Sequence, residues 1–470
     1  GTALDPERSP LNPFRWPAAG QELAGEPRNY AYGHFPLYLL LLIAHAGVAL
    51  ADWLASTTMV FPAAFQPLHT VGRHLADYNY LGLVGRVISA LADLGTLLLV
   101  YWLGKHALAH PSPKLELQPN PLHSETPMQR AKASSPGDTA GLLAAAFYAF
   151  AVLPIQLSHY ATVDAVLTFC VTAAVALAAR WALRGGKWAW VLAGVMAGLA
   201  VGSKFSAILV VIPLAAAALY RVPDGMLRAQ MLVIARRLAV VLTAAGITFV
   251  LTNPFALIEW VAYLNQIGGQ NAMVSGAMDA PYTRQYIGTI PYVYFIAQLS
   301  QWGLGWPLGI LAWGGLMWAT VQFGRHRAGP VLTVMLAWVL PYFATTGLFH
   351  AKFLRYMAPI VPCLIAFGAA WAVGRWKLEA GSWKLEAGSS MSESQLRTCA
   401  KECRFVPHFR LPIPGVQPGK AKVRTASSFQ LSVSSFRPAF VALALVVTAG
   451  WAVAFVQVYH QEHPWIAASR

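Results

Sequence analysis

The sequence predicts an all-α protein, a polytopic transmembrane helical bundle of about ten spans plus an outer-face juxtamembrane helix. Two observations support this fold class. Of the 470 residues, 57% are hydrophobic and only 11% are charged, whereas soluble domains carry about 25% charged residues. The hydrophobic residues also gather in runs close to the length of about 20 residues that a spanning helix needs. This composition excludes a cytosolic enzyme, a disordered chain, a coiled coil and a collagen-like fibre.

Ten apolar runs are candidate spans, because each is long and carries few charges. They are residues 80–103, 140–158, 163–183, 188–203, 205–220, 238–253, 304–323, 331–349, 358–374 and 438–458. The run 36–51 is shorter and is followed by Asp52. We expect it to lie in the outer interface as a juxtamembrane helix, with a true span as the alternative.

Basic residues predict the orientation. The chain carries 34 Lys and Arg against 19 Asp and Glu, a net charge of +15, and in membrane proteins such residues gather in cytoplasmic loops. Every second loop between the predicted spans is rich in them, so nucleic acid is not an expected partner. The remaining loops are then expected on the outer face. They are the segments around Asp164, Lys204, 254–303 and 350–356.

These signals divide the chain into five segments. They are residues 1–79, an outer loop with the juxtamembrane helix; 80–374, the transmembrane body with an outer aromatic loop at 254–303; 375–437, a basic cytoplasmic linker in which WKLEAGS occurs twice; 438–458, the last span; and 459–470, the start of an outer region. The four cysteines do not predict a disulfide framework.

Two charged residues mark possible chemistry at the outer ends of spans. Asp164 opens the 163–183 run, and a carboxylate there can act as a general base or bind a metal; the alternative is an exposed helix N-cap. Lys204 separates two apolar runs and can present its ammonium group to a phosphate. The alternative for Lys204 is a side chain that snorkels to the interface.

Other charged and aromatic residues predict a ligand-binding surface on the same face. Lys352, Arg355 and Tyr356 form a second basic cluster, and two such clusters suggest an anionic lipid headgroup. Arg284, Tyr286 and Tyr292 lie in the aromatic stretch, where tyrosines either anchor the chain at the interface or stack on sugars. Arg86 and Asp93 interrupt the 80–103 run; each is functional or ties neighbouring helices together.

Several short stretches, taken in order, resemble the GT-C superfamily, specifically the protein O-mannosyltransferase-like glycosyltransferases of family 39 and its bacterial relatives. The resemblance covers roughly residues 30–374, and no single motif is specific. The motifs are Tyr32-Gly33-His34-Phe35-Pro36-Leu37, Gly85 to Ala90, His159 to Asp164, Gly198 to Ser206, Thr252-Asn253-Pro254-Phe255, Tyr282 to Tyr294, and Arg355-Tyr356.

The resemblance implies an integral membrane enzyme, in a bacterial plasma membrane, that moves a sugar with inversion from a polyprenyl-phosphate-linked donor. The acceptor hydroxyl belongs to a protein, lipid or glycan on the outer face, and membrane lipid surrounds the body. The implied catalytic residue is Asp164, and a divalent metal is left open. The implied substrate-binding residues are His34, Arg86, His159, Lys204, Arg284, Tyr286, Tyr292, Lys352, Arg355 and Tyr356.

The chain departs from the family pattern at its beginning. Relatives carry a first transmembrane helix and an acidic outer loop before the region that corresponds to residue 36, whereas Asp5-Pro6-Glu7 is a poor substitute. The resemblance therefore implies a fragment, truncated at both ends, that lacks the principal base and is inactive as it stands. A secondary transporter and a non-catalytic lipid-binding membrane protein are the alternative functions.

Overall fold

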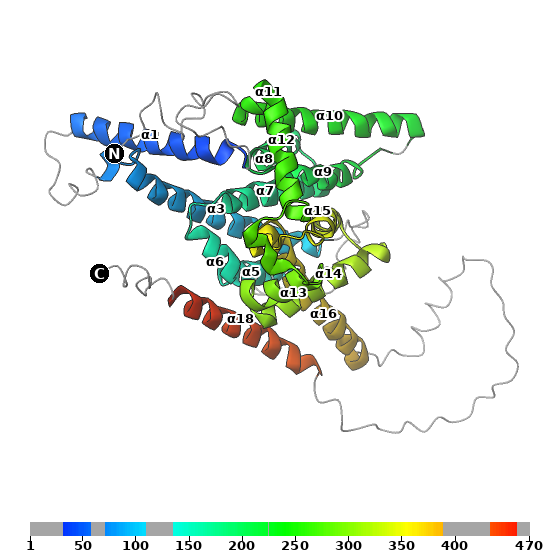
Figure 1. The fold of residues 1–470 in the computed structure, drawn as a ribbon. Helices are drawn as coiled ribbons and strands as arrows, with labels where there is room; N and C mark the ends of the chain where they lie inside the picture. The colour runs from blue at the N-terminus through cyan, green and yellow to red at the C-terminus, as the bar shows by residue number, and fades with distance from the viewer. Residues whose placement is uncertain (1–31, 58–70, 110–134, 224, 389–432, 458–470) are drawn as a thin grey trace, which may run out of the picture. The chain divides into compact units, whose positions relative to one another are not determined.

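The computed structural model describes residues 32–57, 71–109, 135–223, 225–388 and 433–457, and this part of the chain is helical without strands (Figure 1). It divides into two units, Gly1–Val373 with Leu443–Arg470, and Gly374–Ala442. The predicted all-α membrane fold is confirmed. Residues 389–432 of the predicted linker 375–437, and the whole of the predicted outer region 459–470, lie outside the described residues.

Six helices of the described part are long and apolar enough to cross a membrane, or seven if one bent pair forms a single span. Further apolar helices are shorter, at Lys187–Ser203, Phe205–Ala218 and Pro330–Thr346. The sequence runs counted as about ten spans therefore include helices that fall short of the usual length. The run 205–220 is one of them, since it begins as the 3-10 helix η2 (Phe205–Val210) and continues as the short α9 (Val211–Ala218).

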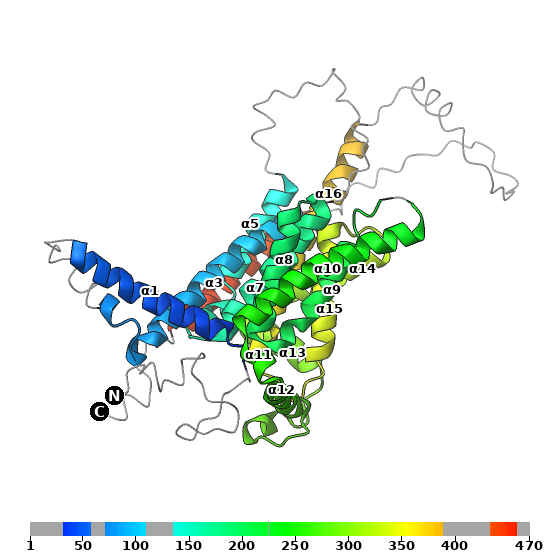
Figure 2. The ribbon, with the colours of Figure 1, turned by 90° about the horizontal axis from the view of Figure 1, so that it is seen from above.

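Four helices pack side by side in the order α3, α7, α8, α10 (Figure 2). They are α3 (Tyr78–Ala107), α7 (Val163–Arg184), α8 (Lys187–Ser203) and α10 (Leu227–Thr252). Helix α7 lies inside the unit, because 78% of its most apolar 18-residue stretch is buried, whereas the corresponding share for α10 is 6%. The apolar side chains that α10 exposes suit contact with lipid tails instead of protein.

The predicted single run 140–158 is broken. Helix α5 (Pro136–Ala149) is followed by α6 (Val152–Ser158) at a bend of 57°. Pro154 explains the break, because a proline ring has no N–H to donate to the carbonyl four residues earlier and clashes with it. The bend returns the chain toward the loop that precedes Asp164.

The second half of the unit adds helices against α7. Helix α15 (Pro330–Thr346) contacts α3, α7 and α9, and the 3-10 helix η5 (Leu354–Ile360) contacts α7 before the chain enters α16. The remaining helices of the body are α14 (Trp306–Gly324), α16 (Val361–Gly388) and α18 (Val433–Gln457). Helix α16 continues through most of the WKLEAGS duplication, which the sequence placed in a linker.

The stretch 254–303, expected as an aromatic loop, is mostly helical. Its elements are α11 (Phe255–Ile258), α12 (Trp260–Ser275), η3 (Pro281–Tyr286), α13 (Val293–Gln298) and the π-helix η4 (Leu299–Gly303). The aromatic residues that suggested an interfacial loop instead pack on one another, as Tyr286 does between Tyr294 and Phe353.

Helix α1 (Phe35–Thr57) is longer than the run 36–51, and Phe35–Leu54 meets the length and hydropathy of a span. It nevertheless diverges from the bundle instead of following α3, α7 and α8 (Figure 2), and only 11% of its apolar window is buried. A juxtamembrane helix therefore stays the prediction for this segment.

Helices α8 and α10 approach closely because two glycines of α8 face the α10 backbone. A Cβ atom added to Gly194 or Gly198 would lie 2.4 Å from the carbonyl oxygen of Val241 or Ala245, respectively. Any larger residue must push the two helices apart. Gly246 of α10 offers a contrast, since nothing lies within 4 Å of its added Cβ.

We predict that Gly198→Ala lowers the free energy of unfolding by about 1–3 kcal/mol, because overpacking at a tight crossing forces the backbone to shift. The matched control Gly246→Ala should be neutral or stabilising by up to about 1 kcal/mol, since alanine favours the helix. Thermal unfolding of both purified variants in the same detergent measures the difference. Equal unfolding midpoints for the two variants would contradict the close packing of α8 on α10.

Candidate functional site

The centre of the candidate site is a buried ion pair between Asp164 and Lys204. The Lys204 Nζ lies 3.2 Å from Asp164 Oδ1, with the two side chains 17% and 1% exposed. The second carboxylate oxygen, Oδ2, is buried and has no hydrogen-bond partner within the described residues. A buried carboxylate oxygen without a donor is costly, so its presence in a stable core suggests a use.

Local sequence puts the two charges at helix ends. Asp164 is in the first turn of α7, where the positive end of the helix dipole favours a carboxylate. Lys204 ends α8 in an extended conformation, with φ −159° and ψ 128°, before the chain turns into η2. Because α7 and α8 are antiparallel neighbours joined by a two-residue turn, the start of one and the end of the other meet.

Aromatic rings surround the ammonium group of Lys204. Its Nζ lies 4.6 Å from the ring centroid of Tyr356 and 5.8 Å from that of Tyr32. Both rings are within the range of cation–π attraction. Tyr356 is 8% exposed and Tyr32 is 39% exposed, so one ring beside the ammonium is buried and the other is open to the surface.

A second cation, Arg355, lies beside this arrangement. Its Nη2 donates to the Tyr32 hydroxyl at 3.5 Å, and its guanidinium carbon lies 5.2 Å from the Phe353 ring centroid. Its Nε has no hydrogen-bond partner within the described part of the chain. Two cations, Lys204 and Arg355, therefore share one cluster with Asp164 and with the rings of Tyr32, Phe353 and Tyr356. We call this cluster the rim. It brings together Asp164, Lys204 and Arg355, as the sequence predicts.

The segment that carries Tyr32 is fixed by the turn that carries Lys204. The Gly33 amide donates to Ser203 O at 3.0 Å, and the His34 amide donates to Asn253 Oδ1 at 2.7 Å. A Cβ atom at Gly33 would lie 1.9 Å from the Gly202 carbonyl oxygen, so only glycine fits this crossing. His34 is itself 1% exposed and supports the segment, two residues after Tyr32.

Two other predicted substrate-binding residues, Tyr286 and Tyr292, lie in the helical stretch 254–303, which precedes η5 in the sequence. Tyr286 is buried against Tyr294 and Phe353, and burial raises the pKa of its hydroxyl. Tyr292 adopts a positive φ of 61° and donates its hydroxyl to Ala344 O at 2.8 Å. These contacts make Tyr286 and Tyr292 packing residues, with Tyr286 joined to the rim through Phe353.

Lys352 and Arg284 contact groups outside the rim. Lys352 is 4% exposed, and its Nζ donates to His350 O at 3.3 Å; burial lowers the pKa of this amine. Arg284 is exposed and pairs with Asp279, which lowers the pKa of that carboxyl. No described contact joins either cation to Asp164.

Arg86 and His159 are both exposed. Arg86 follows Gly85, whose added Cβ would lie 2.5 Å from Ala161 Cβ, so this part of α3 contacts the loop before Asp164. The His159 Nδ1 lies 2.7 Å from Ile155 O, which caps the end of α6. No described contact connects either side chain with Lys204 or Arg355.

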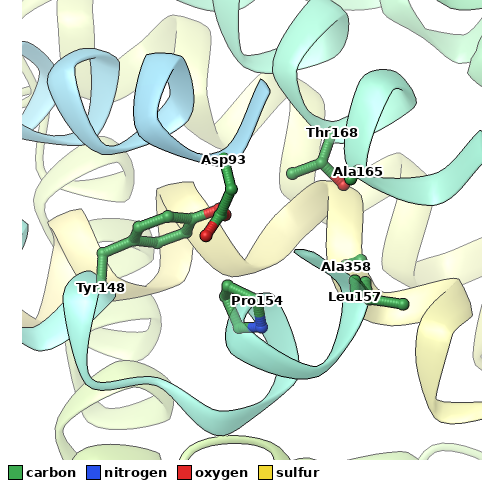
Figure 3. Close-up of a pocket in the computed structure, with 7 residues that line it drawn as sticks. All are labelled: Asp93, Tyr148, Pro154, Leu157, Ala165, Thr168 and Ala358. Atoms are coloured by element: carbon green, nitrogen blue, oxygen red, sulfur yellow. The ribbon is translucent and has the colours of Figure 1, made fainter. Parts of the chain in front are cut away.

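Asp93 forms a separate polar contact deeper in the bundle. Figure 3 shows its carboxylate and the Tyr148 ring pointing toward each other, and the Tyr148 hydroxyl donates to Asp93 Oδ1 at 2.7 Å. The adjoining cavity of about 10 Å³ is also lined by Thr168 of α7 and Ala358 of η5. A cavity of this size has room for roughly one water molecule. Asp93 therefore ties α3 to α5, which is the structural one of the two roles that the sequence left open for this residue.

A metal centre is not formed by the described residues, since no three His, Cys, Asp or Glu side chains among them are close enough to share an ion. At the rim, Asp164 is the carboxylate available in this part of the chain, and it already pairs with Lys204. We therefore derive no step through a metal.

Sequence reasoning missed Tyr32 and Phe353 as rim residues. Tyr32 stands in the same motif as His34, two residues before it, but the prediction names only the histidine. The signal that could have found both is their position within two residues of a predicted residue, since Tyr32 lies two residues before His34 and Phe353 directly follows Lys352. An aromatic ring within about 6 Å of a cation attracts it, so rings on the segments that carry predicted cations are candidate partners.

Comparison with known proteins supports the predicted resemblance. Residues 133–257 match the family model described as dolichyl-phosphate-mannose-protein mannosyltransferase, and this segment contains both Asp164 and Lys204. The match confirms that this part of the chain is GT-C glycosyltransferase-like. No curated protein matches the chain.

Two solved structures share a distant likeness. One is the archaeal oligosaccharyltransferase AglB from Archaeoglobus fulgidus in complex with an inhibitory peptide and a dolichol-phosphate, with 14% identity and a TM-score of 0.43 over 91% of this chain and 48% of that chain. The other is the apo form of the Archaeoglobus fulgidus oligosaccharyltransferase, with 15% identity and a TM-score of 0.43 over 90% and 52%. This chain thus spans about half the length of these structures.

We predict that the Asp93–Tyr148 hydrogen bond contributes about 1–3 kcal/mol to the free energy of unfolding, because its loss leaves a buried polar group with fewer partners. The test is a double-mutant cycle of Asp93→Asn, Tyr148→Phe and the double variant, measured by denaturant unfolding in detergent. Strictly additive single effects would show that the two side chains do not interact.

Proposed function

We propose that this chain is part of a membrane glycosyltransferase that moves a sugar from a polyprenyl-phosphate-linked donor to an acceptor hydroxyl, with inversion at the anomeric carbon. The observation that carries the proposal is the buried Asp164 carboxylate, with one oxygen on Lys204 and the other without a donor. The family match over residues 133–257 supports it from an independent side.

Asp164 is the proposed base. An acceptor hydroxyl must lose its proton as it attacks the sugar, which requires a carboxylate within hydrogen-bond reach. The unpartnered Oδ2 can accept that hydrogen bond while Oδ1 stays on Lys204. An additional acidic residue N-terminal to residue 36, which the family resemblance implies, stays a prediction.

Lys204 and Arg355 are the proposed phosphate ligands. A lysine ammonium carries three donors, so Lys204 can hold Asp164 Oδ1 and a phosphate oxygen at the same time. Arg355 lies at the same rim through Tyr32. The bridging phosphate gains negative charge as it leaves the sugar, and fixed cations stabilise that charge more in the transition state than in the ground state.

The aromatic rings at this rim suit the sugar and keep water out. Tyr32 and Tyr356 present ring faces beside Lys204, and Phe353 continues the aromatic surface toward Tyr286. Excluding water strengthens the attraction between phosphate and cations because the local dielectric constant falls. Lys352, Arg284, Tyr292, Arg86 and His159 are assigned supporting roles in this proposal, as parts of the segments around the rim.

The active site is proposed to face the outer side of the membrane. Asp164 and Lys204 lie at one end of α7 and α8, whereas Arg184 and Lys187 lie at the other. The positive-inside rule assigns the end that is rich in Lys and Arg to the cytoplasm. A lipid-linked donor can then enter sideways from the outer leaflet, and the family name favours a mannose-type sugar and a protein acceptor.

We predict that Asp164→Asn reduces sugar transfer from a radiolabelled polyprenyl-phosphate sugar by at least about a hundredfold, because general base catalysis contributes on that order. The complete protein, including the preceding segment that the family resemblance implies, is assayed in detergent micelles with a hydroxyl-bearing peptide as acceptor. The matched control is Asp138→Asn, which breaks the Lys105–Asp138 ion pair at the other end of the bundle and should leave transfer unchanged. Near-normal transfer by Asp164→Asn would refute the role of this carboxylate, and solute uptake without transfer would favour a transporter.

We also predict that Arg355→Gln weakens binding of polyprenyl phosphate about tenfold or more, since a charge-assisted contact with phosphate is lost. Binding is measured by titration of the lipid into the purified full chain. Arg73→Gln is the matched control, because Arg73 pairs with Asp52 in an exposed position. An equal effect of both substitutions would remove Arg355 from the donor site.

A further inference from the structure

An apolar groove of about 410 Å³ lies between α9, α14 and α15. Ligand pockets in proteins commonly have volumes of about 300–1,000 Å³. The groove is lined by Ala216, Leu219, Tyr220, Phe323, Thr333, Leu336, Ala337, Leu340 and Pro341. It belongs to the end of the bundle away from the candidate site, because α9 begins after Lys204 and ends just before Leu219.

Small residues and a proline create this space. Ala216 and Ala337 leave room between α9 and α15, and α9 stops at Ala218 after only eight residues. Pro341 lies inside α15 and cannot donate to the carbonyl of Ala337, which disturbs the helix beside the groove. The groove therefore follows from the sequence of these elements.

Three arginines follow, in the sequence, two residues that line the groove. Arg221 comes directly after Tyr220, while Arg325 and Arg327 come shortly after Phe323, and all three are exposed. Within the described residues none of the three forms an ion pair, and the sequence has no Asp or Glu between residues 280 and 378. We call these three arginines the basic mouth.

The turn that carries Arg221 is held in place by Arg237 of α10. Its Nη1 donates to the carbonyl oxygens of Ala218 at 3.0 Å and Tyr220 at 2.8 Å, and its Nη2 donates to Arg221 O at 2.9 Å. The guanidinium also stacks on Trp181. Arg221 itself has a positive φ of 59°. This turn is thus a fixed structure that keeps Tyr220 on the groove and Arg221 in the open.

We propose that the groove binds one anionic glycerophospholipid of the surrounding bilayer, with an acyl chain among the apolar residues and the phosphate headgroup at the basic mouth. An apolar groove suits an acyl chain, and clustered Lys or Arg side chains at the membrane surface attract anionic headgroups. The site is distinct from the proposed donor site, whose cations are Lys204 and Arg355. It does not depend on the proposed glycosyltransferase activity.

The experiment uses the full chain reconstituted in nanodiscs that contain equal amounts of phosphatidylglycerol and phosphatidylcholine with identical acyl chains. After transfer to mild detergent, native mass spectrometry measures the lipid that remains bound. We expect one phosphatidylglycerol to be retained about tenfold over phosphatidylcholine, because each cation near an anionic headgroup adds to its affinity. Equal retention of the two lipids, or no retained lipid, would overturn the proposal.

Two sets of variants separate the groove from the basic mouth. Ala337→Trp fills the groove and should abolish retention of both lipids. Arg325→Gln combined with Arg327→Gln leaves the groove intact, and should reduce the preference for phosphatidylglycerol to about twofold or less. The second pair of substitutions is on the surface, so it tests the proposal even if Ala337→Trp fails to fold.

Matched controls use the same substitutions elsewhere. Ala90→Trp adds the same ring at an exposed position of α3, and Arg180→Gln combined with Lys187→Gln removes two exposed cations, one in α7 and one at the start of α8. Both controls should retain phosphatidylglycerol as the unaltered chain does. Loss of retention in these controls to the same degree as in the test variants would show nonspecific lipid association instead of a built site.

Discussion

The burial of one carboxylate, Asp164, in an apolar bundle constrains much of the surrounding structure. Removing a charge from water costs several kcal/mol unless a partner compensates, and the compensating group here is Lys204 at 3.2 Å. That contact requires α8 to end where α7 begins, with the backbone extended at Lys204. The Gly33 crossing brings Tyr32 against the same turn, and only glycine fits there because a side chain would collide with the Gly202 carbonyl. The ion pair, the turn and the crossing are therefore one structural unit.

The two ends of the bundle carry different chemistry because the bilayer separates them. At the Asp164 end, the cation that pairs with the carboxylate lies beside aromatic rings, as Lys204 does beside Tyr32 and Tyr356. At the opposite end, arginines are numerous and exposed, and Arg237 is used to satisfy the carbonyls at the end of α9. An enclosed cation suits selective binding and catalysis, whereas exposed cations suit orientation and contact with anionic lipid.

The sequence predicted the helical membrane fold and the meeting of Asp164, Lys204 and Arg355. Charged residues between apolar runs are expected at the membrane surface, so charges in loops on the same side can come together. Several of the runs counted as spans are helices shorter than the usual spanning length, such as α8 and α9, because hydropathy alone does not report helix length. The sequence also could not foresee that Lys352 turns inward to the His350 carbonyl. Side-chain direction in a loop depends on contacts between distant segments, and periodicity does not report it.

Charge balance gives a reason for the composition of the proposed site. A polyprenyl-phosphate sugar is a phosphodiester with one negative charge, so the donor and Asp164 together match the positive charges of Lys204 and Arg355. When the sugar leaves, the phosphate becomes a monoester that can carry a second negative charge. Asp164 loses its own charge at the same moment if it accepts the acceptor's proton. The site then stays neutral throughout the transfer, which is the condition under which a low-dielectric rim imposes the smallest electrostatic penalty on the reaction.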